Sequence, residues 1–421
     1  MSSPVDIPAA GFAWRPVRAP SRLAVPLHPR PGEAIASTPE GTAVTAGQQV
    51  VTADQRFALV PAAGTFVGIR DNRARIDTGP TTVSPPELPP SLVIHERDMA
   101  AAELEQVRAD QRGHWFDTLR LRGVHADRRL CPDLHGQLRA AQARPVDAVV
   151  CCVLDSDPTL QFASAVLSRF LGEVVAGTAA IGRLCGARRT VLVVDADAPS
   201  RQLAAVRAWC RRLGVALERL NNPYPQADPT LLLYALLDRR LRPGRPPVDA
   251  GVVLLDPPAA AAVAHAVVHG EPVTHALVGV RDHATAASHF AVAPVGSSAA
   301  HVLGELSIGT RGRVVRADDL FRDNPIAPAD AVIGEGELTL HVTPGEPVVN
   351  PDPCVRAGWC LDVCPTRIHP AALLDAAQRR DRDMAEQFGI DACIECGLCT
   401  YVCPSRLPLM QSIRGMRDMP K

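Results

Sequence analysis

The 421-residue sequence has few aromatic side chains and no dominant charge. Phenylalanine, tryptophan and tyrosine make up only 4% of the residues, so alanine, valine and leucine must fill its cores. The 44 basic and 45 acidic side chains leave a formal net charge of -1. This balance gives no reason to expect a nucleic acid or an anionic membrane as a direct partner.

Two other features are missing from the sequence. No apolar run reaches the length of about 18–20 residues that a membrane-spanning helix needs. The segment Met1–Arg18 lacks the charged start and the apolar stretch of a secretory signal. We therefore expect a cytoplasmic protein, whose link to the inner face of a membrane would run through partner proteins.

Twelve cysteines are present, and they are unevenly distributed. Seven fall between Cys354 and Cys403. The other five are scattered through a body of ordinary globular composition: Cys131, Cys151, Cys152, Cys185 and Cys210. A disulfide scaffold would spread its cysteines through a small secreted domain, so a dense cluster in a long chain favours metal binding.

Proline density and hydrophobic patterning divide the chain into six regions. We expect a multi-domain protein of α/β and α+β class. The regions are a flexible N-terminus (1–21), a β-rich region (22–77), a proline-rich linker (78–90), an α/β region (91–250), a smaller α+β region with its connection (251–345) and a cysteine-rich tail (346–421).

Continuous apolar strands define the α/β region. Val146–Leu154 and Arg189–Asp195 read as buried strands, and the helical segment Ser164–Leu184 separates them. Further helices are expected at Arg201–Leu213 and Leu231–Leu241. This alternation predicts a parallel sheet with helices on both faces. In the tail, Pro370–Gln387 predicts an amphipathic helix between two groups of cysteines.

The second group of cysteines is Cys393-Ile-Glu-Cys396-Gly-Leu-Cys399-Thr-Tyr-Val-Cys403-Pro404. Its spacing, C-x2-C-x2-C-x3-C-P, is that of bacterial two-cluster ferredoxins. Three thiolates two residues apart wrap one cubane cluster, and the fourth reaches the other cluster. Gly397 lets backbone amides approach the sulfides. A match of this length is highly specific.

The first group repeats the same frame with one defect. In Cys354-Val-Arg-Ala357-Gly-Trp-Cys360-Leu-Asp-Val-Cys364-Pro365, alanine stands where the second cysteine belongs. By the crossed arrangement of two-cluster ferredoxins, one complete [4Fe–4S] cluster is held by Cys364, Cys393, Cys396 and Cys399. The other site has three thiolates: Cys354, Cys360 and Cys403.

Because alanine cannot ligate iron, the three-cysteine site has three possible states. In order of preference these are a [3Fe–4S] cluster, a [4Fe–4S] cluster with water or another external ligand, and a lost cluster. The three surviving cysteines argue against complete loss. Asp362 is a candidate substitute ligand, although a solvated carboxylate is the simpler interpretation.

Four stretches precede or include the cysteines in a specific order: Val44–Val50 with Ala58–Ile69, Tyr224–Gln226 with Leu231–Leu241, Gly251–Val280, and Cys354–Cys403. Together they resemble the RnfC-type family of electron-transport subunits, including its PduS-like relatives, over roughly Arg22 to Arg417. The resemblance implies a barrel-sandwich hybrid at 22–77, an α/β core at 91–250, a β-grasp domain of SLBB type at 251–345 and a ferredoxin-like domain at 346–421.

One segment departs from this family. The family binds FMN and NADH through a glycine-rich loop, but the corresponding segment Trp115–Cys131 has a single glycine, Gly123. Bulky side chains would block the approach of a phosphate to the backbone. The family's asparagine- and glutamate-bearing strand end is here Cys152-Val-Leu-Asp155-Ser-Asp157-Pro158. We therefore expect that FMN and NADH are not bound.

Three functions follow as hypotheses. The first is an iron–sulfur electron-transfer subunit of an RnfC-like redox complex, which relays electrons between donor and acceptor proteins without oxidising NADH itself. The second is a subunit of an FMN- and NADH-dependent dehydrogenase or corrinoid reductase with an unusual loop. The third is a non-redox assembly module whose clusters are structural.

Overall fold

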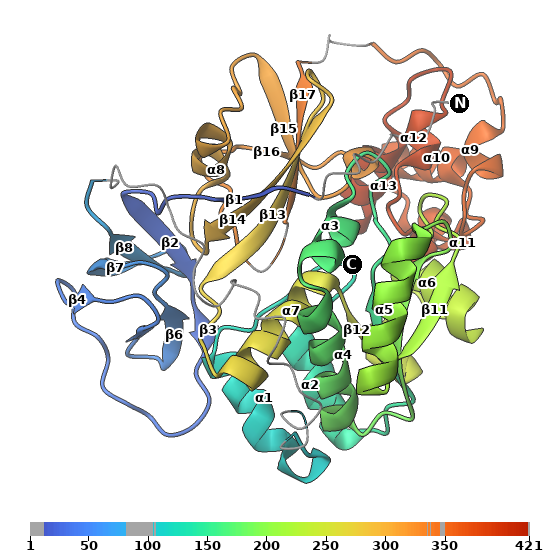
Figure 1. Ribbon diagram of the computed structural model, residues 1–421. Coiled ribbons are helices and arrows are strands. Elements are labelled where there is room, and N and C mark those ends of the chain that lie inside the picture. The colour runs from blue at the N-terminus through green and yellow to red at the C-terminus, as the bar shows by residue number, and fades with distance from the viewer. Residues whose placement is uncertain are drawn as a thin grey trace.

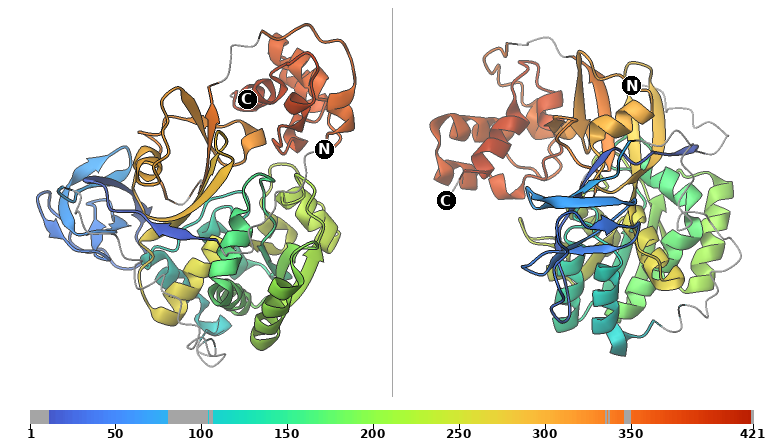
Figure 2. Two further views of the ribbon diagram at one scale, coloured as in Figure 1. Left: turned by 45° about the horizontal axis from the view of Figure 1, so that its top comes forward. Right: turned by 90° about the vertical axis from the view of Figure 1, so that its left-hand side faces the viewer.

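The computed structural model describes residues 12–80, 104, 107–334, 336, 338–345 and 350–419. The chain folds as a mixed α/β multi-domain protein with four sheets and a helical cysteine-rich tail (Figure 1). The tail projects from one side of the body, beside the α/β region and the six-stranded sheet (Figure 2). The part of the expected linker that spans residues 81–90 lies outside the described residues.

Two small antiparallel sheets form the region that follows the N-terminus. One has the order β2-β8-β7-β4 and the other β3-β6-β5. Their strands are β2 (Arg22–Pro26), β3 (His28–Pro29), β4 (Ala43–Val44), β5 (Gln49–Val51), β6 (Arg56–Leu59), β7 (Gly64–Arg70) and β8 (Arg73–Asp77). Their facing side chains, such as Leu23, Val50 and Phe66, make one compact apolar core.

The α/β region is built on a four-stranded parallel sheet of order β11-β10-β9-β12. Its strands are β9 (Ala148–Cys152), β10 (Arg189–Asp195), β11 (Ala216–Leu220) and β12 (Val252–Leu255). Its helices are α1 (Arg112–Leu121), α2 (Leu134–Ala143), α3 (Phe162–Arg169), α4 (Leu171–Cys185), α5 (Ser200–Leu213), α6 (Pro229–Leu237) and α7 (Pro257–Ala264).

Helices cover both faces of this sheet, as the sequence predicts. Helices α4, α5 and α7 pack on one face, and α6 packs on the other. Close packing of α4 on α7 depends on Gly177, because a Cβ there would collide with the carbonyl oxygen of Ala260. The expected boundary at residue 250 differs from the structure, since β12 pairs with β9 and completes the α/β sheet.

The helix expected at Ser164–Leu184 is broken into two. Helices α3 and α4 meet at Phe170 at an angle of 96°. The described residues contain no single helix long and apolar enough to cross a membrane, whereas this bent pair meets the length and composition criteria jointly. Most of the side chains of α4 are buried inside the α/β core.

The six-stranded sheet has the order β1-β14-β13-β17-β15-β16. Its members are β1 (Trp14–Pro16), β13 (His275–Asp282), β14 (Ala287–Pro294), β15 (Arg313–Ala317), β16 (Pro325–Ile326) and β17 (Thr339–Pro344), with helix α8 (Ala299–Glu305) between β14 and β15. Strand β17 lies between β13 and β15, parallel to the first and antiparallel to the second.

Strand β1 corrects the expectation of a flexible N-terminus at 1–21. Residues 1–11 lie outside the described part, but Trp14 pairs in parallel register with Phe290 of β14. The Trp14 ring also contacts Phe290 and Phe170, with centroids 5.5 Å and 5.7 Å apart. These aromatic contacts fix the segment to two domains, although Trp14 itself is only partly buried.

The cysteine-rich tail is helical, as expected. Its helices are α9 (Trp359–Asp362), α10 (Pro370–Arg379), α11 (Arg382–Gln387), α12 (Leu398–Tyr401) and α13 (Leu409–Arg417). The single helix expected at Pro370–Gln387 is two, because Arg380 takes a left-handed conformation (φ 54°) and Asp381 caps α11. Short helical turns complete the chain at Ala109–Gln111, Pro247–Ala250, His265–His269, Leu320–Arg322 and Ile390–Ala392.

Candidate metal centre

The two groups of cysteines fold into copies of one loop. Arg356 and Glu395, two residues after the first cysteine of each copy, both have positive φ, of 56° and 53°. Gly358 and Gly397 follow with φ of 81° and 75°, and each precedes a one-turn helix, α9 or α12. The copies therefore present their cysteines in the same way, except at Ala357.

Four cysteines surround one hollow of about 310 Å³ of empty space. They are Cys364, Cys393, Cys396 and Cys399, and the other walls are largely apolar, with Ile368, Ile394, Met410 and Ile413. Burial raises the pKa of Cys396 to about 11 and that of Cys399 to about 12, and the nearby Cys364 thiol adds to both shifts. Such thiols become thiolates when a metal replaces the proton.

The other three cysteines lie nearer the surface. Burial raises the pKa of Cys360, and the neighbouring Cys403 and Cys354 thiols add to this shift. Cys354 and Ala357 are exposed, and Cys360 and Cys403 are partly buried. We call the four cysteines that line the hollow the buried group, although Cys393 is only partly buried, and we call the other three the surface group.

Among the described residues, no three histidine, cysteine, aspartate or glutamate side chains converge as ligands of a single metal ion. The grouping of the cysteines is of another kind, because in an iron–sulfur cluster each thiolate binds a different iron atom. The four cysteines line one hollow. This donor set fits a cluster with several iron atoms.

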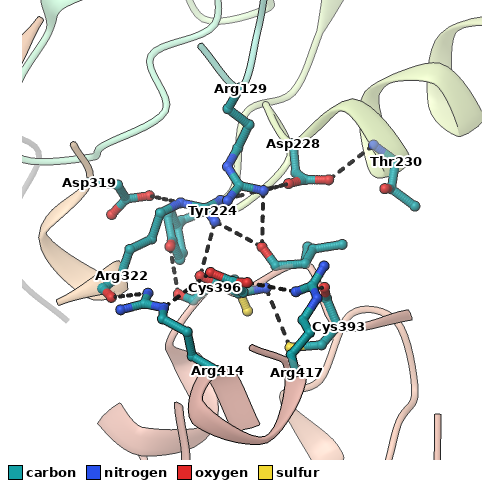
Figure 3. A network of polar contacts seen from close by, with 12 residues as sticks. Arg129, Tyr224, Asp228, Thr230, Asp319, Arg322, Cys393, Cys396, Arg414 and Arg417 are labelled. Carbon is teal, nitrogen blue, oxygen red and sulfur yellow. Dashed lines mark hydrogen bonds and ion pairs between the residues drawn. The ribbon is translucent and has the colours of Figure 1, made fainter. Parts of the chain in front are cut away.

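Two arginines, the buried Arg322 and the partly buried Arg129, hold the loop that carries Cys393 and Cys396 against the rest of the molecule (Figure 3). Arg322 is 5% exposed, and its Nη1 donates to the carbonyl oxygens of Ile394 and Glu395 at 2.8 Å and 3.0 Å. Arg129 of the α/β region also donates to Ile394, at 3.2 Å.

Acidic groups balance these two arginines. Asp228 lies 3.0 Å from Arg129 and 3.7 Å from Arg322, and Asp319 lies 3.5 Å from Arg322. The phenol of Tyr224 donates to the carbonyl oxygen of Cys396 at 2.6 Å. The cysteine loop is therefore fixed by residues from two other domains. Sequence reasoning marked Tyr224 only as part of a family segment and missed Arg129 and Arg322.

Arg417 and Glu395 continue this network within the tail. Arg417 donates to the carbonyl of Cys393 at 3.2 Å and to Glu395 Oε1 at 2.6 Å. The amide of Glu395 donates to the sulfur of Cys393 at 3.4 Å. Backbone amides directed at cysteine sulfur are the contacts that tune the potentials of iron–sulfur clusters.

Large apolar side chains are exposed around the surface group. The three most exposed in the described chain are Tyr401 at 72%, Val355 at 68% and Trp359 at 53%. They come from the two cysteine loops, and helices α9 and α12, which carry Trp359 and Tyr401, pack together. Exposed apolar groups gathered in this way are typical of protein–protein contact sites.

The region expected to have lost its flavin shows an ion pair at the carboxyl edge of the sheet. Arg128 donates to both oxygens of Asp256, at 2.6 Å and 2.8 Å. Asp256 directly follows β12, which pairs with β9. From β9 the chain adds β10 and β11 on one side, and it then returns to place β12 on the other side of β9. This is the crevice where open α/β sheets bind ligands, and Arg128 crosses it.

The two acids at the end of β9 are engaged by other groups. Asp155 accepts hydrogen bonds from the amides of Ala163 and Ser164 and from the Ser164 hydroxyl. Asp157 accepts from Thr159 and from the amide of Leu320 in the six-stranded domain. These carboxylates thus stabilise a loop and a domain contact.

Gly123, the one glycine of the segment Trp115–Cys131, also has a packing role. Its φ is 77°, and an added Cβ would collide with Leu59 of the N-terminal region and with the carbonyl oxygen of Val273. The glycine thus lets three parts of the chain approach each other.

Two family models match the sequence. A "Nuo51 FMN-binding domain" matches residues 133–265, and a "4Fe-4S dicluster domain" matches residues 346–404. The first match begins two residues after the end of the segment Trp115–Cys131. The second contains all seven cysteines of the two loops.

Curated relatives share about a quarter of their residues with this chain. One, a subunit of the ion-translocating oxidoreductase complex of Edwardsiella ictaluri, is 25% identical over 274 residues, which cover 64% of this chain and 34% of that protein. Another, from the Na(+)-translocating ferredoxin:NAD(+) oxidoreductase complex of Acetobacterium woodii, is 24% identical over 255 residues, 60% of this chain and 58% of that protein. The chain thus spans between about a third and three fifths of these relatives.

Among solved structures, an NAD+-reducing [NiFe]-hydrogenase in the H2-reduced state has a similar fold. The TM-score is 0.54 at 15% identity, with 78% of this chain and 67% of that chain covered. This likeness concerns the fold alone.

Proposed function

Since the chain is related to the RnfC-type family, as its sequence predicts, we propose that it relays electrons between two protein partners as an iron–sulfur subunit of a redox complex. The observation that carries the proposal is the hollow lined by Cys364, Cys393, Cys396 and Cys399, while the other three cysteines lie nearer the surface. This grouping supports the crossed ligand pattern of two-cluster ferredoxins. Relatives that are named as parts of oxidoreductase complexes support the assignment to such a complex.

The buried group is assigned to one [4Fe–4S] cluster, with Cys364, Cys393, Cys396 and Cys399 as ligands. When bound, such a cluster stores and passes one electron at a time. The surrounding residues exclude water and supply positive charge. Arg322 and Arg129 bind the carbonyl oxygens of the ligand loop, so their charges stabilise additional negative charge in the hollow.

The surface group is assigned to a second, smaller or more open cluster, with Cys354, Cys360 and Cys403 as ligands. Since Ala357 offers no donor and its side chain faces solvent, a [3Fe–4S] cluster is preferred over a [4Fe–4S] cluster with an external ligand. The exposed Val355, Trp359 and Tyr401 give a partner protein an apolar contact beside this cluster.

We further propose that this chain does not oxidise NADH. The Arg128–Asp256 pair in the crevice, and the engaged carboxylates of Asp155 and Asp157, support this view. A second candidate, a flavin-dependent dehydrogenase or corrinoid reductase subunit, is favoured by the match of residues 133–265 to an FMN-binding domain.

The same proposal includes the identities of two domains. Apart from β1, the six-stranded domain begins with the β13–β14 hairpin, continues with helix α8, and ends with strand β17, which lies beside β13. This arrangement supports a β-grasp domain of SLBB type. The two small sheets at 22–77 support a barrel-sandwich hybrid. The α/β domain extends to the end of α7.

A cofactor inventory of the anaerobically purified chain tests the proposal. We expect seven or eight iron atoms per chain, as roughly follows from one [4Fe–4S] cluster with a [3Fe–4S] or second [4Fe–4S] cluster. We also expect no flavin absorbance and no reduction of the clusters by NADH. Near-zero iron in a folded anaerobic preparation rules the proposal out, and bound flavin with NADH-driven reduction selects the second candidate.

A further inference from the structure

Asp319 is a buried carboxylate whose hydrogen bonding is incomplete. It precedes the turn Leu320–Arg322, is 2% exposed, and accepts the amide of Phe321 with Oδ1 at 3.0 Å. Its other oxygen, Oδ2, accepts no hydrogen bond from the part of the chain that the structure describes, although the Nε of Arg322 lies 3.5 Å away. A buried charge without full hydrogen bonding is costly, whereas a neutral acid needs fewer partners.

Two more buried acids lie around this turn. Asp157 is 3% exposed and accepts the amide of Leu320 at 2.8 Å, and Asp228 is 4% exposed. Arg322 lies 3.7 Å from Asp228, which also pairs with Arg129 at 3.0 Å (Figure 3). Two guanidinium groups therefore face three carboxylates. The excess negative charge is relieved when one of these acids binds a proton.

The histidines and the remaining acid beside the turn do not change this balance. Burial lowers the pKa of His341, which lies 3.5 Å from Asp157, so its ring is neutral at about pH 7. Burial also lowers the pKa of its hydrogen-bond partner His283, to about 4. Asp318 adds a negative charge, but it lines an open cleft between α6 and the tail, where solvent screens it.

The charged groups on the side of the tail bind one another. Glu395 lies 3.3 Å from Arg414 and 2.6 Å from Arg417. Both arginines also donate to backbone carbonyl oxygens, and neither forms an ion pair with Asp319 in the described structure. Among the carboxylates around the turn, all of them in the described part of the chain, only Asp319 has a buried oxygen without a hydrogen-bond donor.

Asp319 is linked to the cysteine loop through two shared neighbours. One is Arg322, which binds two carbonyl oxygens of this loop. The other is Tyr224, which interacts with Asp319 and donates to the carbonyl oxygen of Cys396 at 2.6 Å. A phenol has one hydrogen, and this one is donated to Cys396. The phenol oxygen can therefore accept a hydrogen bond from a protonated Asp319.

The titration of Asp319 falls in the neutral pH range. Burial raises the pKa of this carboxyl to about 7, the charge of Asp157 adds to the rise, and the guanidinium of Arg322 opposes it. Additional negative charge beside a carboxyl group raises its pKa further. An electron placed on the cysteine loop therefore favours the protonated form of Asp319.

We propose that Asp319 binds a proton when the four-cysteine cluster gains an electron and releases it when the cluster is oxidised. The inference rests on the proposed relay function and goes beyond it, because it makes the transfer depend on pH. One electron comes from the donor protein, which is oxidised. One proton comes from solvent and forms an O–H bond on Asp319, so the net charge of the region stays the same. Arg322 and Tyr224 carry the coupling.

The test is an EPR-monitored redox titration of the iron-loaded full chain between about pH 6 and pH 9. In the wild type, the oxidised form should lose the proton above about pH 7, while the reduced form keeps it. The midpoint potential of the four-cysteine cluster should therefore become more negative with rising pH, by up to about 59 mV per pH unit for one electron. Below about pH 7 both forms hold the proton, and the potential should level off.

Asp319→Asn puts a permanently neutral group of the same shape at this position. We expect its potential to be independent of pH and to equal the low-pH value of the wild type, which a purely structural role would not produce. Asp155→Asn is the matched control. Burial raises the pKa of Asp155 to about 7 as well, but its side chain binds Ala163 and Ser164 of α3. This control should keep the wild-type slope.

Infrared difference spectra give a second measurement, which needs no substitution. Above about pH 7, reduction of the wild type should produce the C=O band of a protonated carboxylic acid. Asp319→Asn should lack this band. Should Asp319→Asn fail to bind iron, Asp319→Glu takes its place, and it should keep the slope but begin it at a different pH. An unshifted onset in Asp319→Glu overturns the proposal.

Two further results overturn the proposal and leave the relay function standing. One is a wild-type potential that does not change with pH. The other is an Asp319→Asn variant that keeps the wild-type slope. Loss of the slope in Asp155→Asn has the same meaning, since the proton would then bind elsewhere. A chain that holds no clusters refutes the relay function itself.

Discussion

The carbonyl oxygen of Phe321 occupies the space in which a Cβ atom on Gly397 would lie. Gly397 follows Cys396 in the second cysteine loop, and Phe321 belongs to the domain of the six-stranded sheet. The ligand loop therefore packs against another domain at a position where only glycine fits. Gly358 has the same place in the first loop and a similar φ, yet no atom lies within 4 Å of its would-be Cβ.

This difference gives a matched pair of substitutions. We expect Gly397→Ala to loosen the tail, lower the thermal midpoint and reduce the iron content, because backbone must move to accommodate the methyl group. Gly358→Ala should be destabilised only by placing alanine in a left-handed backbone conformation, which costs on the order of 1 kcal/mol. Thermal unfolding and iron counts of both variants check this. Equal losses of thermal stability and iron in the two variants would show that backbone strain, and not the contact with Phe321, causes the losses.

Ala357→Cys restores the missing thiol in the surface group. We expect about one more iron atom per chain if the present cluster is a [3Fe–4S] form. The narrow, near-isotropic EPR signal of the oxidised protein should then disappear. Val355→Cys adds an exposed thiol two residues away and serves as the control, which should keep the signal. An unchanged spectrum in Ala357→Cys argues for the form with an external ligand or for loss of the cluster.

Arg322→Gln removes a buried positive charge beside the four-cysteine hollow. A reduced cluster carries one more negative charge, so we expect its midpoint potential to become more negative, on the order of tens of millivolts. The variant also removes the arginine partner of the buried Asp319, whereas Asp228 keeps Arg129. Breaking this buried pair costs roughly 3–5 kcal/mol of stability. An EPR-monitored redox titration and thermal unfolding measure the two effects.

Arg406→Gln is the control for this charge. Arg406 pairs with Asp352 at 2.7 Å, but its side chain is 57% exposed, so solvent screens it. We expect little change in stability and no change in the potential of the four-cysteine cluster. A potential that does not respond to Arg322→Gln would limit the role of that residue to holding the ligand loop in place.

Asp155 makes stability depend on pH. Burial raises the pKa of this carboxyl to about 7, even though it accepts hydrogen bonds from Ser164 and Ala163. Between about pH 4 and pH 7 the native state thus holds a proton that the unfolded state has lost. The free energy of unfolding should fall as the pH rises through this window and change no further above it.

Asp155→Asn removes this titration and keeps an oxygen for the two amides. Relative to wild type, we expect the variant to gain stability between pH 5 and pH 8, on the order of a few kcal/mol. Asp197→Asn changes an exposed acid that follows the neighbouring strand and should leave the slope intact. Urea unfolding at both pH values compares them. A wild-type slope in Asp155→Asn would show that another group titrates.

Strands with continuous apolar runs could be predicted closely from the sequence. Arg189–Asp195 forms β10 with the expected bounds, because a run of buried β-branched residues is compatible only with an interior strand. The break at Phe170 could not be predicted, since a phenylalanine is compatible with a helix. Trp14, from a distant part of the chain, packs against that ring, a contact that the local sequence does not reveal.

The grouping of the cysteines as cluster ligands stays a prediction, based on the covalent spacing of the cysteines along two short loops. The supporting charges could not be predicted. Arg129 and Arg322 lie far from the cysteines in sequence and belong to no motif. Their role follows only from the way two domains fold around the tail. Tyr224 had a weak signal, its place in a segment shared with the resembled family.

The pairing of β1 with β14 also has a consequence for biosynthesis. Trp14 emerges from the ribosome early, but its register partner, Phe290, is made only after the whole α/β domain. Strand β1 therefore stays unpaired while the α/β domain is synthesised and folds, and Trp14 can pack against Phe290 only afterwards. The nascent chain thus closes its first segment late, at a step where a chaperone or a slow codon would have its greatest effect.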